Sequence, residues 1–442
     1  MPDLIPGAPP GRMPRARSLL LVSVLILLVA AACLVAWSFS CSIDASTDPA
    51  FAAREHATNV AGTAPDDSFP AGVLRLDSLL EPIRARDRIP ALACAVVRGD
   101  SLCALGVVGV RRAGSPERAR WYDRFHIGSD MKAMTATLVA SLIEEGRLRW
   151  NSTLAEIFPD LARGMRPEYR GVTIEMLMQH RSGLPDDRNI FRLLRLCGLP
   201  GSPREQRLRA MQMALAERPA RAPGTRNTYA NMNFTILGAV VERVTGDSWE
   251  SQMRKRVFEP LGMDRAGFGA PHTPGRVDQP WGHALAGPRV FWVGSVLLPA
   301  AVHPAGNVSL SMSDWGKFAA IHLEAERGCC RLLSRDSFRR LHAETLPGSH
   351  FAAGWGVACD DTLGTLLEHA GSDGFWYAVI LIAPRLDEAI LTAANIGPAR
   401  GEKACFDALR LALRLGMARN GTTLSAGSST RAGSSPRGSR PH

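Results

Sequence analysis

Several patterns that usually mark a metal site or a nucleic-acid site are missing from this sequence of 442 residues. It has no Cys-x-x-Cys, no His-Glu-x-x-His and no His-x-His, and its 11 histidines are scattered, so no metal and no cofactor is predicted. The net charge is +10, but no run rich in lysine and arginine occurs between the two tails. Nucleic acid is therefore not predicted as a partner, and an anionic membrane or cell-wall polymer fits the charge better.

One long apolar run is present, and it lies near the N-terminus. Residues 19–37 are apolar except for Ser23, and at ~1.5 Å per residue they span roughly 28 Å, close to the thickness of a bilayer core. Arginines precede the run and mark its cytoplasmic end. We predict an uncleaved signal anchor over residues 1–37, in the inner membrane, with the remaining chain in the periplasm. The small residues 30–32 before Cys33 leave cleavage, and hence a secreted or periplasmic protein, open.

The nine cysteines of an exported chain would permit disulfides. Cys94, Cys103, Cys359 and Cys405, however, lie in apolar patterns that are typical of buried free thiols. No partner can be named for the adjacent pair Cys329–Cys330.

Composition divides the rest of the chain into a linker, one folded region and a tail. Residues 38–72 are rich in Ala, Asp, Ser, Thr and Pro, which predicts a linker. Residues 417–442 are rich in Ser, Gly and Arg, which predicts a disordered tail. Residues 73–416 form the predicted domain, and no internal repeat divides it. With 46% hydrophobic residues in the chain, this length is ample for a sizeable core.

Apolar patterns place strands at both ends of this domain and helices between them. A helix over 74–89 is followed by a hairpin of 91–98 and 102–112. A long stretch, 147–260, is mostly helical, residues 263–305 are irregular, and 313–326 form a helix. The last strands are 354–359, 365–369, 375–382 and 389–394, followed by a helix over 403–415. We therefore predict an α/β (α+β) fold: an antiparallel sheet of N- and C-terminal strands flanked by helices, plus a mostly helical lobe.

The first of three polar clusters begins the most apolar helix, residues 131–143, which is predicted to be buried on all sides. Ser129 and Lys132 stand three residues apart and so share one face. A buried lysine can act as a base near neutral pH, and the N–H groups at a helix start favour developing negative charge. The turn therefore offers a nucleophile, a base and part of an anion site. An N-capping serine with a surface lysine is the alternative.

The second cluster follows the turn at Pro223–Gly224 and carries Tyr229 and Asn231 ahead of a helix over 234–244. A phenol in a cationic pocket can transfer a proton, and an amide can both donate to and accept from a substrate amide. The chain has only four tyrosines, so a tyrosine at this place is notable. The alternative is a turn with a capping asparagine and a core tyrosine.

The third cluster, residues 368–374, ends a predicted strand. Gly371 would let a substrate backbone approach the strand edge. His369 could orient or protonate a substrate, and the backbone N–H of Ser372 could donate to an oxyanion. Alternatively, His369 has only a structural role and does not contact a substrate.

Together, the clusters resemble the serine β-lactamase and penicillin-binding protein superfamily, in particular its branch of class C β-lactamases, D-Ala-D-Ala carboxypeptidases and esterases. That branch carries Ser-x-x-Lys, then Tyr-x-Asn, then Lys/His-x-Gly, in this order. Further segments are similar to the same family. These are residues 172–185 (VTIEMLMQHRSGLP), residues 258–263 (FEPLGM), Pro304-Ala305-Gly306 and Ser313-Asp314-Trp315. The resemblance covers roughly residues 75–415 and favours the catalytic interpretation of Ser129.

The resemblance implies a serine hydrolase that forms an acyl-enzyme on a β-lactam, a D-amino-acid peptide or a small ester. Ser129 would attack, Lys132 and Tyr229 would move the proton, and the N–H groups of Ser129 and Ser372 would hold the oxyanion. Asn231, His369 and Gly371 would bind the substrate.

The first and third motifs differ from the commonest form of the family pattern, at three positions in all. Asp130 and Met131 occupy the two places between Ser129 and Lys132, where an acid is unusual and where the third place is often Ser or Thr. His369 stands where the family often has lysine. The site therefore has less fixed positive charge for a substrate carboxylate, which favours an esterase or peptidase over efficient penicillin hydrolysis.

Two other interpretations compete with this one. Residues 370–374 nearly match the nucleophile elbow of an α/β-hydrolase, with Ser372 as nucleophile, but they lack its first glycine and precede a predicted strand. The same fold could also serve as a non-hydrolytic penicillin-binding or cell-wall sensor. The sequence predicts no oligomeric state.

Overall fold

The computed structural model describes residues 68–187, 195–286, 289–293, 298–328 and 331–419. All of these residues belong to one compact unit of the chain, which begins at Ala64. The predicted membrane anchor, most of the linker, the pair Cys329–Cys330 and residues 420–442 lie outside the described residues. Among the helices that are described, none combines the length and the apolar character needed to cross a membrane.

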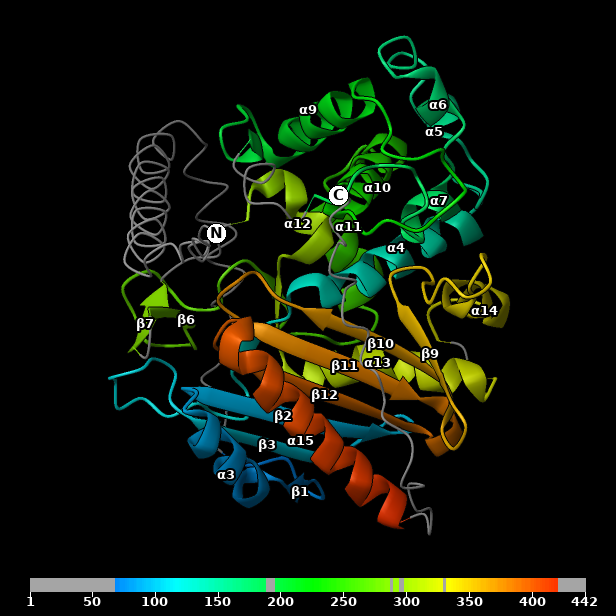
Figure 1. The fold of residues 1–442 in the computed structure, drawn as a ribbon. Coiled ribbons are helices and arrows are strands. Elements are labelled where there is room, and N and C mark those ends of the chain that lie inside the picture. The colour runs from blue at the N-terminus through cyan, green and yellow to red at the C-terminus, as the bar shows by residue number, and fades with distance from the viewer. Residues whose placement is uncertain (1–67, 188–194, 287–288, 294–297, 329–330, 420–442) are drawn as a thin grey trace, which may run out of the picture. The chain divides into compact units, whose positions relative to one another are not determined.

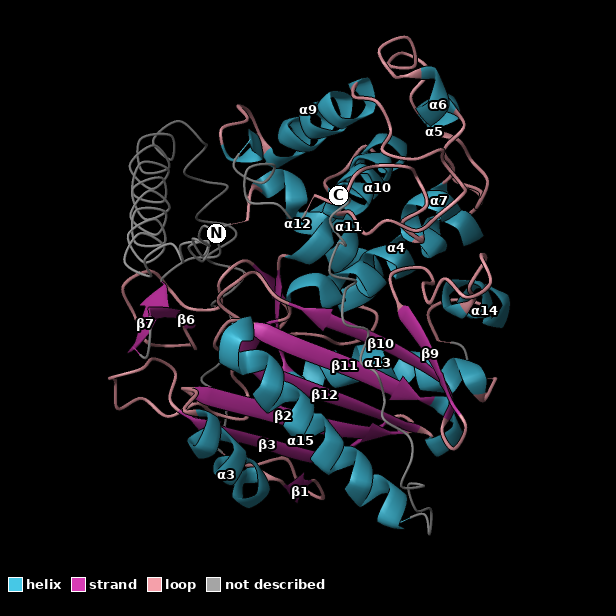
Figure 2. Ribbon diagram, viewed as in Figure 1, coloured by secondary structure: helices cyan, strands magenta, loops and turns pink. Residues whose placement is uncertain are grey.

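A seven-stranded sheet joins the two ends of the domain, as predicted (Figure 2). Its order is β1-β3-β2-β12-β11-β10-β9, and all neighbours are antiparallel except β1 and β3. The strands are β1 (Leu74–Arg75), β2 (Ala91–Arg98), β3 (Ser101–Gly109), β9 (Gly356–Asp360), β10 (Gly364–Gly371), β11 (Tyr377–Ala383) and β12 (Glu388–Ala394).

The central strands are buried on both faces, and β2 shows how its sequence permits this. Its side chains alternate between two cores, with Leu92, Cys94 and Val96 on one face and small alanines with Val97 on the other. Helices α3 (Asp77–Asp87) and α15 (Pro398–Arg419) cover the first face (Figure 1). Helix α13 (Met312–Glu326) packs on the second, where alanines leave room for it.

A helical region adjoins this second face, and its centre is α4 (Met131–Glu144), the helix predicted to be buried on all sides. Eleven of its 14 residues are buried. The surrounding helices are α5 (Leu154–Ile157), α6 (Pro167–Arg170), α7 (Ile174–Met178), α9 (Pro203–Ala216), α10 (Asn231–Thr245), α11 (Trp249–Met253), α12 (His303–Gly306) and α14 (Arg335–His342). The predicted architecture of a sheet with a helical lobe is therefore correct.

The region predicted to be irregular, residues 263–305, contains more structure than expected. Strand β5 (Gly267–Phe268) joins β4 (Arg124–His126) and β8 (Val308–Ser311) in a three-stranded sheet. Strands β6 (Gly282–Ala286) and β7 (Arg289–Val293) form a hairpin. These strands were missed because each is short and the glycines and prolines around them are typical of loops.

Two helix boundaries and two thiols also differ from the predictions. Helix α3 begins at Asp77 rather than at 74, because Leu74 and Arg75 pair with β3. Helix α15 continues to Arg419, so a tail can begin only after that residue and not at 417, since Met417 is buried in the core between α15 and the sheet. Cys94 and Cys405 are buried free thiols as predicted, whereas the free thiols of Cys103 and Cys359 lie at partly or fully exposed positions.

Candidate active site

Ser129 lies in a single 3₁₀ turn, η1 (Gly128–Asp130), that leads directly into α4. Its Oγ accepts a hydrogen bond from Lys132 Nζ at 2.9 Å and another from the Tyr229 hydroxyl at 2.8 Å. The first two predicted clusters therefore meet at one oxygen, although Tyr229 is 100 residues away in the chain. A hydroxyl between an amine and a phenol has two neighbours that can exchange a proton with it.

The side chain of Lys132 is completely buried. Besides Ser129, its Nζ donates to Asn231 Oδ1 at 2.9 Å and to the carbonyl oxygen of Ala305 at 2.8 Å. The same nitrogen lies 4.9 Å from the centre of the Tyr229 ring. These contacts fix the position of the nitrogen, and they show that Asn231, predicted to bind substrate, also holds the lysine.

The end of strand β10 touches the η1 turn through two glycines. A Cβ atom on Gly371 would lie 1.9 Å from the carbonyl oxygen of Ile127, and one on Gly128 would lie 2.3 Å from the backbone nitrogen of Ser372. Gly128 also has φ +53°, which favours glycine. Only glycine permits this approach, which brings the backbone nitrogens of Ser129 and Ser372, the predicted oxyanion donors, to the same end of the site.

His369 points to the same region and contacts Asp130, the residue after the serine. Its Nδ1 lies 3.2 Å from Asp130 Oδ1 and 3.0 Å from the carbonyl oxygen of Ala370. Burial, together with the positive charge of Lys132, lowers the pKa of His369 to about 3. Burial also raises the pKa of Asp130 well above its ordinary value, although Lys132 opposes this. The imidazole is therefore uncharged at neutral pH.

Ser372 does not have the environment of a nucleophile. Its hydroxyl donates to the carbonyl oxygen of Trp376 at 2.6 Å and accepts from the backbone N–H of Gly374. The chain then continues into strand β11, so the strand-to-helix turn of an α/β-hydrolase elbow is not formed here. These contacts contradict the interpretation of Ser372 as a nucleophile.

Two residues that support the site were not recognised from the sequence. His180 stacks on the Tyr229 ring at 4.5 Å, and its Nδ1 accepts from the backbone N–H of Ala230 at 3.2 Å. The carboxylate of Asp187 accepts from the backbone N–H groups of Asn231 and Met232 at 2.7 and 2.6 Å, at the start of α10. His180 lies in the segment 172–185 that resembles the family, and this was the one signal available for it.

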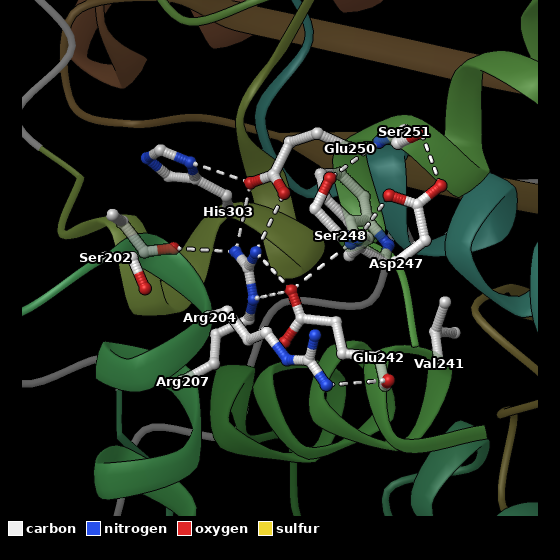
Figure 3. A network of polar contacts seen from close by, with 12 residues as sticks. Ser202, Arg204, Arg207, Val241, Glu242, Asp247, Ser248, Glu250, Ser251 and His303 are labelled. Atoms are coloured by element: carbon white, nitrogen blue, oxygen red, sulfur yellow. Dashed lines mark hydrogen bonds and ion pairs between the residues drawn. The ribbon is translucent and has the colours of Figure 1, made fainter. Parts of the chain in front are cut away.

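A buried network of charges lies behind α12, the helix whose Ala305 carbonyl accepts from Lys132 (Figure 3). Arg207 of α9 is fully buried and pairs with Glu242 of α10 at 2.6 Å and Glu250 of α11 at 2.8 Å. His303, the first residue of α12, lies 3.5 Å from Glu250. Burial alone would raise the pKa of Glu250, but Arg207 and His303 outweigh it and lower the pKa to about 2.

An open pocket with a mostly apolar lining adjoins Asn231, and its volume, including the solvent space at its mouth, is about 620 Å³. Its wall comes from the residues before and within α9, from the start of α10 and from Val302. The side chains that line it include Leu184, Pro185, Leu196, Ala210, Met232 and Val302. Within the described part of the chain, no group of three or more His, Cys, Asp or Glu side chains is arranged to hold a metal ion.

Comparison with known proteins identifies the family of the chain. The sequence profile of the Beta-lactamase family matches residues 76–414. The chain is 28% identical to Penicillin-binding protein 4 of Amycolatopsis lactamdurans over 288 residues, which are 62% of this chain and 72% of that protein. Other curated relatives are longer than this chain, and the match to this chain covers 63% of their length.

Solved structures share the fold. The octameric penicillin-binding protein homologue from Pyrococcus abyssi has a TM-score of 0.63 and 21% identity, and covers 77% of this chain and 76% of that one. The D-alanine carboxypeptidase AmpC from Burkholderia cenocepacia has a TM-score of 0.57 and 19% identity, with 75% of this chain and 96% of that one covered. The match of the family profile to residues 76–414, most of the chain, shows that the protein belongs to the β-lactamase family.

Proposed function

We propose that the protein is a serine hydrolase that forms an acyl-enzyme with an ester or an amide. The observation that carries the proposal is the position of Ser129 Oγ, which accepts hydrogen bonds from both Lys132 and Tyr229. The backbone of Ser372 faces the same turn. A nucleophile, two groups that can exchange its proton and two main-chain N–H donors make up the parts that acyl transfer requires.

In acylation, Ser129 Oγ attacks the carbonyl carbon of the substrate. Its proton passes to Tyr229 as the phenolate, or to Lys132 after its ammonium group, which donates three hydrogen bonds in the resting site, has released a proton. From either group the proton then passes to the leaving alcohol or amine. The N–H groups of Ser129 and Ser372 donate to the oxyanion while the tetrahedral intermediate exists. Asn231 and the backbone at Gly371 align the substrate, and His369 contacts it beside the reacting bond.

In deacylation, a water molecule attacks the acyl-enzyme. The same proton carriers accept a proton from this water and return one to Ser129 Oγ, and a carboxylic acid is released. Lys132 is well placed for this role, because its side chain is completely buried and its Nζ lies 2.9 Å from Ser129 Oγ.

We propose a small ester or a D-amino-acid amide as the substrate, in preference to a penicillin. The imidazole of His369 supports this choice, because it lacks the fixed positive charge that a lysine in its place would offer to the carboxylate of a penicillin. The name of the relative from Burkholderia cenocepacia, a D-alanine carboxypeptidase, adds D-amino-acid peptides to the classes worth testing. The pocket beside Asn231 offers space for an apolar substituent.

A labelling experiment tests the proposal. The purified protein is treated with a fluorophosphonate and with a fluorescent penicillin, and the modified residue is identified by mass spectrometry. Ser129 should carry the label, Ser129→Ala should lose it, and Ser372→Ala should keep it. If a folded protein binds the penicillin but does not react with the fluorophosphonate and does not hydrolyse any ester, the protein is a non-hydrolytic sensor and the proposal is wrong.

We further propose that residues 19–37 hold the protein in the inner membrane with the hydrolase domain in the periplasm, as their length and apolar character suggest. N-terminal sequencing of the mature protein tests this. A mature chain that starts after residue 38 would show that the segment is a cleaved signal.

A further inference from the structure

The segment 172–185 has no role in the proposed mechanism so far, yet it contains an unusual backbone position. Helix α7 ends in it at Met178, and His180 follows in the left-handed region, with φ +57°. Glycine is the usual residue at this place after a helix, because it has no Cβ. Of the four non-glycine residues with positive φ in the described part of the chain, His180 is the buried one. A histidine kept in an unfavourable conformation indicates that its side chain is needed there.

The imidazole of His180 is packed among aromatic rings. It stacks on Tyr229 with 4.5 Å between the ring centres and 29° between the ring planes. The rings of Phe234 and Phe351 lie 5.5 and 5.8 Å from it, and His180 is only 2% exposed. The imidazole therefore forms a fixed surface against which the phenol ring rests.

Two hydrogen bonds set the orientation of this imidazole. The backbone N–H of Ala230 lies 3.2 Å from Nδ1, and the side-chain nitrogen of Asn233 lies 3.1 Å from the same atom. A backbone N–H can only donate, so Nδ1 is the acceptor and the hydrogen of the neutral ring is on Nε2. The hydroxyl of Ser182 donates to Asn233 Oδ1 and so fixes the amide that faces the ring.

Backbone contacts attach the residues before Tyr229 to the same place. The N–H of Thr228 donates to the carbonyl oxygen of His180 at 2.8 Å, and the side-chain nitrogen of Asn227 donates to that of Gln179 at 2.6 Å. The phenol hydroxyl, at the far end of the ring, lies 2.8 Å from Ser129 Oγ. A tilt of the Tyr229 ring would therefore move the hydroxyl away from the nucleophile.

We propose that His180 is the positioning residue of Tyr229 in the transfer of the Ser129 proton. Its ring supports the phenol from one face, and the hydrogen bonds to Nδ1 prevent this support from turning. His180 acts through the phenol hydroxyl and not on the substrate. The inference rests on the proposed hydrolase function and gives the segment 172–185 a part in it.

The variant His180→Asn removes the ring and little else. Asparagine tolerates a positive φ, and its side-chain oxygen can take the place of Nδ1 as the acceptor for Ala230. The rate constant for labelling of Ser129 by the fluorophosphonate should fall by about tenfold to hundredfold, as expected when a reacting group is misplaced. An unchanged rate in a folded His180→Asn protein would overturn the proposal.

The matched control is His272→Asn. It removes another buried imidazole, which stacks on the ring of Trp281 with 4.3 Å between the ring centres. The labelling rate of this variant should equal that of the wild type, because His272 has no contact with Tyr229 among the described interactions.

A double-mutant cycle with Tyr229→Phe separates positioning from a general structural role. Phenylalanine keeps the ring that His180 supports and lacks the hydroxyl. If His180 acts through that hydroxyl, His180→Asn should change the rate of the Tyr229→Phe protein by no more than about twofold. The same loss in both backgrounds would show that His180 only maintains the structure, and the proposal would be wrong.

A spectroscopic measurement on the wild type covers variants that fold poorly or react too slowly. The chain has only four tyrosines, so 3-fluorotyrosine gives few ¹⁹F signals, and Tyr229→Phe identifies that of residue 229. This signal should be displaced from its position in urea, because the ring is held beside the imidazole. A native signal at the position found in urea would show that the ring is not held, which contradicts the proposal.

Failure of this inference and failure of its premise give different results. A folded wild type that does not react with the fluorophosphonate rejects the proposed hydrolase function, and with it a positioning role of His180 in proton transfer. A wild type that is labelled at Ser129, with equal losses from His180→Asn in both backgrounds, rejects only the role of His180.

Discussion

At the scale of single residues, the site depends on the fixed positions of Lys132 and Tyr229 beside the hydroxyl of Ser129, and not on the identity of these residues alone. Lys132 donates to a hydroxyl, a side-chain amide and a backbone carbonyl, so its nitrogen can hardly move. Tyr229 is held from behind by the ring of His180. Rigid placement of reacting groups lowers the entropy cost of reaching the transition state.

Replacing the lysine tests its place in the proton transfer. Lys132→Ala should keep the fold and reduce the rate of Ser129 labelling by about 10²- to 10⁴-fold, the usual contribution of a positioned acid or base. Stopped-flow or gel-based labelling with the fluorophosphonate measures this rate. Lys317→Ala, which removes a partly exposed lysine on α13, is the matched control. Near-normal ester hydrolysis by a well-folded Lys132→Ala protein would contradict the mechanism.

A second prediction concerns the contact of Gly371 with the η1 turn. Gly371→Ala should abolish labelling and lower the melting temperature, because the added Cβ would lie 1.9 Å from the carbonyl oxygen of Ile127 and must displace backbone. Gly171→Ala is the control, since nothing lies within 4 Å of the Cβ there. Thermal denaturation and labelling of both variants measure the difference. Unchanged labelling in Gly371→Ala would mean that strand β10 does not approach the turn so closely.

At the scale of elements, the four-residue helix α12 determines where Lys132 sits. It offers the carbonyl oxygens of Pro304 and Ala305 to Thr135 and Lys132 of α4. So short a helix has little stability of its own, so its position must come from its neighbours. Those neighbours are α10, on which Pro304 packs at Gly238, and the buried charges around Arg207.

Removing the centre of this network should destabilise the domain. Arg207→Leu leaves the carboxylates of Glu242 and Glu250 buried without their main partner, which typically costs about 3–5 kcal/mol of unfolding free energy. Arg243→Leu breaks an exposed pair with Asp160 and should cost far less, because solvent screens such a pair. Urea denaturation measures both. Equal losses in the two variants would show that the buried network does not hold these helices.

The same network predicts a dependence of stability on pH. The pKa of Glu250 falls from its ordinary value of 4.5 to about 2 in the folded protein, so its contribution to stability is complete above about pH 4.5 and decreases as the pH falls toward 2. The difference in melting temperature between the wild type and Glu250→Gln should therefore shrink as the pH is lowered from about 5 to 3. Glu156→Gln, at a half-exposed site, should show a small difference throughout. A gap that widens at low pH would contradict this assignment.

The residues proposed to carry the chemistry could be selected from the sequence, because each lies in a short motif with its own spacing. The contacts that support them could not. Asp130 and His369, or Arg207 and Glu250, lie in different parts of the chain, and nothing local marks them as neighbours. The small strands β5, β6 and β7 were missed for a related reason, since pairing with a partner defines them more than their own composition does.

At the scale of the whole molecule, the sheet is covered on one face by α15, the last described helix. A fragment of residues 68–419 should fold and be labelled at Ser129 like the full chain. A fragment of residues 68–397 should aggregate or remain unfolded, because loss of α15 exposes the apolar side chains of Val379, Leu381 and Ile390. Circular dichroism and labelling measure the outcome. A folded, reactive 68–397 fragment would show that α15 is dispensable.

The position of β12 has a consequence for the synthesis of the protein. This strand lies between β2 and β11 in the sheet. Leu92 of β2 pairs with Ala394 of β12, which lies 302 residues further along the chain, so the sheet is continuous only when both strands are present. Until a ribosome has made nearly the whole domain, the β2–β3 hairpin has an open edge that could pair wrongly with another nascent chain. Folding of this domain is therefore a late event, because the sheet can be completed only after β12 has been made.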